Sequence, residues 1–229
     1  MGFSRYSIPQ QGTLVRSGEE RATLVRRTYS LVFASIVVTI GAAAYAMSSQ
    51  RMMDAVLAHP WIMLLCVFAP LFLAQMARNS FPQNIGFVFL FTFAEGLYIA
   101  PFIAIAERFS PGIAMQAGVL TLSAFGALTL YAFVSRRDFS AWGGFLMTGV
   151  IVLIVASLLM MFTHSTAGYT WLAGIGVLLF SGLLVFDTWR LRNVFGPDDY
   201  VMAAVSIYLD LLNMFVFILS LLSGGRRSN

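Results

Sequence analysis

The sequence predicts an all-α membrane protein, a bundle of seven transmembrane helices. Of its 229 residues, 59% are hydrophobic and only 10% are charged, whereas about 25% are charged in an ordinary soluble domain. The mean hydropathy is +0.82. Seven apolar segments follow one another along the chain, each close to the roughly 20 residues that a helix needs to cross a bilayer. This leaves almost no room for an extramembrane domain.

The elements are expected in the following order. Residues 1–27 are polar and predict a cytoplasmic tail, with its last part open to helix formation. The transmembrane domain then covers residues 28–222, and residues 223–229 form a short C-terminal tail. Arginine-containing connections separate most of its segments, and Gly196 with Pro197 ends the sixth. The expected spans are about 28–48, 61–77, 84–106, 113–134, 142–162, 169–192 and 199–222.

The arginines predict the orientation of the bundle. With the amino terminus in the cytoplasm, the tail and the inner connections hold the larger share of the 14 basic residues, as the positive-inside rule requires. Seven spans then place the carboxyl terminus outside. A six-span alternative, with a re-entrant last segment, places it inside together with Arg226 and Arg227.

Several function classes are excluded by what the sequence lacks. The basic residues are all arginines and lie in the tails, in the connections and at the ends of segments, so we expect no nucleic-acid partner. The single Cys66 permits no intrachain disulfide and no thiolate metal cluster. No phosphate-binding loop, metalloprotease helix or serine elbow is present, and no nucleophile has a neighbouring base. We therefore expect neither an enzyme nor a bound organic cofactor.

Three acids lie inside apolar segments: Glu95, Asp187 and Asp210. An ionised carboxylate at the centre of a span costs about 2.5 to 3.5 kcal/mol on insertion scales, so such groups usually face a bundle interior or water. At 1.5 Å per residue, Asp210 and Glu95 both lie roughly 16 Å from the inner ends of their helices, and Asp187 lies about 12 Å from the inner end of its own. The two aspartates are therefore predicted to face each other across adjacent antiparallel helices.

Such an aspartate pair predicts a proton sensor. Two carboxylates in contact at low dielectric do not both ionise easily, and they titrate in two coupled steps. With one proton the pair is held by a shared hydrogen bond. With none it repels itself unless a cation enters, and a divalent ion that prefers oxygen ligands, such as calcium, fits there. A falling pH is thus expected to compete with the cation and to favour closure.

The charged neighbours of this pair leave alternatives open. Arg190, three residues after Asp187, would simply neutralise that aspartate at the inner interface. Arg78, at the inner end of the second segment, either extends to lipid phosphates or reaches inward to the aspartates. Glu95 is either a third ligand or a hydrogen-bonded interior acid.

A polar stripe runs along the last segment. Ser206, Asp210, Asn213, Phe217 and Ser220 are spaced by 4, 3, 4 and 3 positions, which places them on one face of a helix. The stripe predicts either a hydrogen-bonded seam between helices or a seam that also lines an ion path.

The stretch "VFDTW", a short polar turn and "AVSIYLDLLNMFVFILSLL" resemble the Bax inhibitor-1 family, and within it the bacterial members. The resemblance implies a seven-helix bundle with the last helix central, in a bacterial inner membrane. It implies a pH-sensitive calcium leak channel gated by Asp187 and Asp210. An arginine that latches the pair in some members is matched approximately by Arg78, in differing flanking sequence, whereas Glu95 has no clear counterpart.

Two other functions stay open from the same resemblance. Some bacterial members are associated with a membrane-anchored ATP-dependent protease, and the polar tail of residues 1–27 suits a segment that such a partner grasps. A proton-coupled transporter is the third hypothesis. The expected partners are accordingly the lipid bilayer, calcium ions, protons and, under the second hypothesis, the protease.

Overall fold

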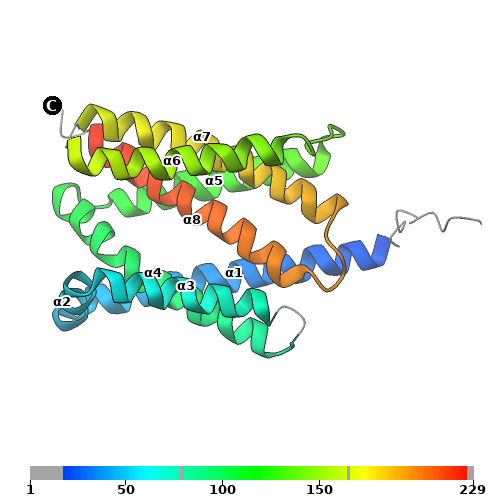
Figure 1. The fold of residues 1–229 in the computed structure, drawn as a ribbon, viewed down its shortest axis with the longest axis horizontal. Coiled ribbons are helices and arrows are strands. Elements are labelled where there is room, and N and C mark those ends of the chain that lie inside the picture. Colours follow the sequence, from blue (N-terminus) through cyan, green and yellow to red (C-terminus); the bar gives the residue numbers. More distant parts are fainter. Residues whose placement is uncertain (1–17, 78–79, 164–165, 226–229) are drawn as a thin grey trace, which may run out of the picture.

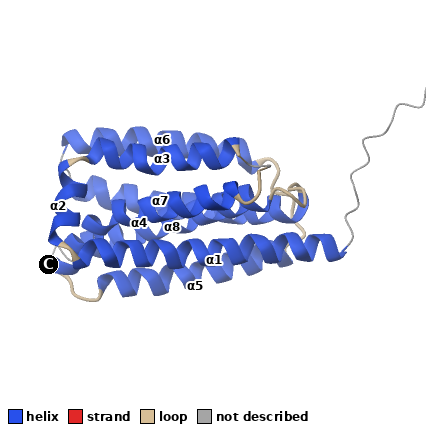
Figure 2. Ribbon diagram, turned by 90° about the horizontal axis from the view of Figure 1, so that it is seen from below, coloured by secondary structure: helices blue, strands red, loops and turns tan. Residues whose placement is uncertain are grey.

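The computed structural model describes residues 18–77, 80–163 and 166–225, and within them it contains helices and no strand (Figure 2). The protein is thus all-α, as predicted. In chain order the helices are α1 (Gly18–Ser48), α2 (Gln50–Ala58), α3 (Pro60–Met76), α4 (Gln83–Phe109), α5 (Ile113–Val134), α6 (Trp142–Thr163), α7 (Thr166–Asn193) and α8 (Tyr200–Gly225).

Helix α8 lies between two groups of helices. Figure 1 shows it slanting between α5, α6 and α7 on one side and α1 to α4 on the other. It packs most extensively against α7, and it also contacts α1, α5 and α4. In the most apolar stretch of α8, 44% of the residues are buried, against 11% in α6. Because α6 exposes so much apolar surface, it faces lipid, whereas α8 supplies much of the core.

Among the described residues, six helices are long and apolar enough to cross a membrane: α1, α4, α5, α6, α7 and α8. The count becomes seven when α2 and α3, which meet at a bend of 89°, are taken as one broken span. By itself α3 has 17 residues, slightly fewer than the roughly 20 that span the hydrocarbon. Helix α8 is one unbroken helix of 26 residues, more than the roughly 20 that are needed to cross the hydrocarbon.

The structure defines the start of α1 and the connection that follows it. Helix α1 begins at Gly18, so the last ten residues of the polar tail are helical. Glu19 and Glu20 in the first turn stabilise this end of the helix, because their negative charges interact favourably with the positive end of the helix dipole. The connection after α1 holds the short helix α2, which ends before His59 and Pro60. Proline at the first helical position starts α3 in a new direction, because its ring fixes φ and it has no backbone N–H to donate.

Helices α1 and α4 approach each other closely at Gly96. A Cβ atom added to Gly96 would lie 2.4 Å from the carbonyl oxygen of Thr39 and 2.8 Å from the Cβ of Ala42. Small residues allow such contacts in membranes, where apolar burial gives little drive for helix association. This contact fixes α4 against α1 on the side of the bundle opposite α6 and α7.

Candidate functional site: an aspartate pair between two helices

Asp187 lies on α7, six residues before that helix ends at Asn193. Only 7% of the residue is exposed. Its Oδ1 accepts a hydrogen bond from Nη1 of Arg190 at 2.9 Å, one turn further along the same helix. The neutralising interaction considered for Arg190 is therefore present.

Asp210 lies on α8, ten residues after that helix begins at Tyr200. It is 4% exposed, and its Oδ2 is buried with no hydrogen-bond partner among the described residues. Its carboxyl group is close enough to that of Asp187 to share a hydrogen bond, and it also lies within the electrostatic reach of Arg190. The structure thus brings two acids, 23 positions apart in the chain, together beside one cation.

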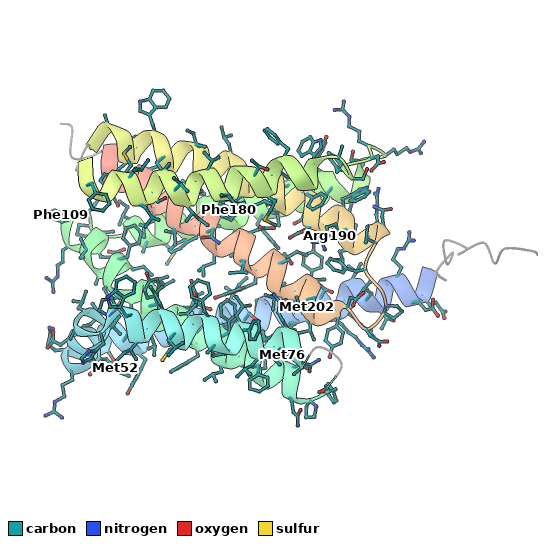
Figure 3. The ribbon with its side chains drawn as sticks, in the orientation of Figure 1. Met52, Met76, Phe109, Phe180, Arg190 and Met202 are labelled. Carbon is teal, nitrogen blue, oxygen red and sulfur yellow. The ribbon has the colours of Figure 1, made fainter. Side chains whose placement is uncertain are left out.

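Arg190 is held in place by aromatic rings as well as by Asp187. Its guanidinium carbon lies 4.5 Å from the ring centroid of Phe195 and 5.6 Å from that of Phe186, within the range of cation–π attraction. Figure 3 shows Arg190 near the end of α7 and Met202 near the start of α8, where these two helices are joined. The cation therefore lies at the end of the bundle formed by the α7–α8 turn.

The other charged candidates lie elsewhere. Glu95 is half-buried on α4, within electrostatic reach of Tyr208 on α8. Arg78, the candidate latch, lies outside the described residues. Among the described residues no group of three or more His, Cys, Asp or Glu side chains is arranged to hold a metal ion.

The polar stripe of α8 forms a half-buried face around the buried Asp210. Two of its polar side chains, the amide of Asn213 and the hydroxyl of Ser220, donate hydrogen bonds within α8 itself. Asn213 donates to the carbonyl of Leu209 at 2.8 Å, and Ser220 donates to that of Val216 at 2.9 Å. Phe217 stacks on Phe180 of α7, with ring centroids 5.8 Å apart. Ser206 is half-buried on the same helix. These donations leave the oxygen atoms of the amide and hydroxyl groups as acceptors.

Sequence reasoning missed a buried polar contact that joins three helices. The hydroxyl groups of Thr39 on α1 and Tyr208 on α8 lie 2.7 Å apart, and Thr39 Oγ1 lies 3.1 Å from the carbonyl oxygen of Thr92 on α4. All three residues are buried. The available signal was a tyrosine and two threonines near the middle of apolar segments, where a lone hydroxyl needs a partner.

The amino-acid sequence is similar to those of known proteins. The family described as "Inhibitor of apoptosis-promoting Bax1" matches residues 21–228. Protein lifeguard 4 of Mus musculus is 30% identical over 96% of this chain and 95% of its own length. Bax inhibitor 1 of Schizosaccharomyces pombe is 35% identical over 88% of this chain and 76% of its own. An uncharacterized protein of Caulobacter vibrioides is 34% identical over 86% of this chain and 87% of its own.

Proposed function

Because the chain belongs to the Bax inhibitor-1 family, we propose that it is a pH-sensitive cation leak channel gated by Asp187 and Asp210, with calcium as the permeant ion. The observation that carries the proposal is the burial of both carboxyl groups between α7 and α8, close enough to share a hydrogen bond and beside Arg190. Buried acids within membrane spans mark ion and proton pathways more often than they mark packing sites.

The proposal includes a topology. Taking α2 and α3 as one span gives seven crossings, with α8 enclosed by the others. The amino terminus is cytoplasmic and the carboxyl terminus lies outside, in a bacterial inner membrane. Bacterial relatives such as the Caulobacter vibrioides protein support that location. The aspartate pair and Arg190 then lie toward the cytoplasm.

The proposed gate depends on the charge of three groups. A hydrogen bond between Asp187 and Asp210 requires one proton on the pair, so with Arg190 the cluster is neutral and closed. Removal of that proton leaves two carboxylates and one guanidinium, a net charge of −1 in a largely dry site. The carboxylates then repel each other, and a cation is drawn in. Flux is therefore expected to rise with increasing pH.

The carboxylates suit a passing calcium ion better than a resident one. Two carboxyl groups supply at most four oxygen atoms, whereas calcium in proteins takes about 6 to 8 oxygen ligands. The described residues around the pair supply no third acid. An ion at the pair therefore keeps part of its hydration water, which favours release over retention.

The test is calcium flux into liposomes between pH 6 and 8. The wild-type protein is expected to conduct more at the higher pH, and Asp210→Asn is expected to stay at the low-pH rate, because an amide cannot be deprotonated. Asp187→Asn is expected to abolish the pH response as well. Asp54→Asn, at an exposed site on α2, is the matched control and should behave as wild type.

Two outcomes would replace the channel by another function. Flux that neither replacement alters, with binding of a membrane-anchored protease intact, would favour a regulatory partner. Proton-linked uptake of a solute that both replacements abolish would favour a transporter.

A further inference from the structure

A large cavity opens at the end of the bundle opposite the α7–α8 turn. It has a volume of about 620 Å³ and is lined by residues of α4, α5, α6, α7 and α8. Phe109, on its rim, lies at one end of the molecule in Figure 3, and Arg190 lies toward the other. We call this cavity the vestibule. It contains the last part of the polar stripe, Phe217 and Ser220.

The lining of the vestibule is uncharged but offers oxygen atoms. Ser220, Ser223 and Ser157 each donate a hydrogen bond to a backbone carbonyl of their own helix, at 2.7 to 2.9 Å. Tyr169 on α7 donates to the backbone carbonyl of Met160 on α6 at 2.9 Å. Because the hydroxyl protons are already used, the lone pairs of these oxygens remain for water or a cation. None of the residues lining the vestibule is ionisable at neutral pH.

The inner limit of the vestibule on α7 and α8 is an aromatic stack. The rings of Phe180 and Phe217 are 5.8 Å apart with an angle of 23° between their planes. Phe217 rests on Gly176, where an added Cβ would lie 2.6 Å from its ring. The absence of a side chain at Gly176 lets the ring lie directly against the α7 backbone.

The same number of residues separates the aromatic stack from the aspartate pair on α7 and on α8. Phe180 lies seven residues before Asp187 on α7, and Phe217 lies seven residues after Asp210 on α8. Seven residues are two helical turns, so the two layers lie about 10 Å apart along the antiparallel pair and on the same helix faces.

The fully buried side chains between these two layers are apolar, and the polar Ser181 and Asn213 are half-buried there. Leu184 and Met214 are each 0% exposed, and the Sδ of Met214 lies 3.5 Å from the hydroxyl of Ser181. An ion that enters the vestibule therefore meets a dry constriction before it reaches a carboxylate. Hydrophobic constrictions of this kind block ions by excluding water.

We infer that the Phe180–Phe217 stack is a hydrophobic gate between the vestibule and the aspartate pair. Rotation of Phe217 off Gly176 into the vestibule opens it. The inference rests on the proposed function, since a barrier to ions matters only where ions pass. Ionisation of the aspartates and movement of the rings are then two separate conditions for conduction.

Thiol labelling tests the barrier without any measurement of flux. In a Cys66→Ser background, Ser220→Cys and Asn213→Cys place a thiol in the vestibule and one turn beyond Phe217. A membrane-impermeant thiol reagent is applied to membrane vesicles of each orientation, and the side that labels Ser220→Cys is taken as the vestibule side. From that side Asn213→Cys is expected to react at least about tenfold more slowly.

Adding Phe217→Ala is expected to raise the labelling rate of Asn213→Cys about tenfold or more, because the dry layer is lost. Phe180→Ala removes the other half of the stack and should act in the same direction, so one variant that fails to fold does not end the test. Phe215→Ala is the control, because this half-buried ring faces the cavity between α1 and α5 and should leave the rate unchanged.

Two results would overturn the gate. One is equal labelling of Ser220→Cys and Asn213→Cys with both rings present; the other is slow labelling of Asn213→Cys in both alanine variants. Failure of the proposed function looks different: the labelling pattern holds, but calcium flux does not depend on Asp187 or Asp210.

Discussion

Replacing Gly96 by alanine tests the contact that fixes α4 to α1. The new Cβ would stand 2.4 Å from the Thr39 carbonyl oxygen and 2.8 Å from the Cβ of Ala42, whereas favourable carbon contacts begin near 3.5 Å. Both obstacles are rigid, so the two helices must separate by about 1 Å. That movement would also stretch the 2.7 Å contact between Thr39 and Tyr208 beyond good hydrogen-bond distance.

Overpacking of a tight contact usually costs about 1 to 3 kcal/mol. For a chain of this size, each kcal/mol lowers the Tm by about 2 to 4 °C, so Gly96→Ala is expected to lower it by about 2 to 12 °C. The assay is thermal unfolding of the purified protein in detergent micelles, followed by intrinsic fluorescence. Gly41→Ala on α1 is the matched control, because no atom lies within 4 Å of a Cβ there. Equal Tm values for the two variants would refute the argument.

Two further predictions concern the polar groups around α8. Arg190→Gln removes the cation that pairs with Asp187 at 2.9 Å. Because the side chain of Arg190 is 34% exposed, the lost attraction is about 1 to 2 kcal/mol. The midpoint of the flux response should therefore move up by about one pH unit. An unchanged midpoint, measured by liposome flux from pH 6 to 8, would exclude Arg190 from the gate. Thr39→Val is expected to lower the Tm in detergent more than Tyr208→Phe does. Valine leaves the buried tyrosine hydroxyl without its threonine partner. After Tyr208→Phe, in contrast, the threonine hydroxyl still bonds to backbone carbonyls. The opposite order would contradict this account of the contact.

The sequence alone was enough to predict an all-α membrane protein. Hydropathy locates long apolar helices well, because the bilayer permits few other ways to satisfy the backbone. It also singles out Asp187 and Asp210, because acids in apolar sequence are costly unless they are paired. Their depth in adjacent antiparallel helices then predicts that they meet; in the structure both are buried and lie within electrostatic reach of each other.

What the sequence did not predict depends on side-chain geometry. The contact at Gly96 was missed because close approach depends on how helices cross, and Gly41 shows that a glycine in an apolar segment does not by itself imply contact. The bend between α2 and α3 was also missed, since α2 lies in a connection whose average hydropathy is low. Hydroxyl groups such as those of Thr39 and Tyr208 find partners on distant helices, which no local pattern reveals.

The turn between α7 and α8 does more than connect two helices. The backbone N–H groups of Val194 and Phe195 both bond to the carbonyl of Arg190, and the ring of Phe195 lies beneath the guanidinium that pairs with Asp187. Under the proposed function, a change in the protonation of Asp187 acts directly on Arg190, whose carbonyl and guanidinium both contact this turn. A spectroscopic probe on the turn would follow the titration of a site that no dye can reach.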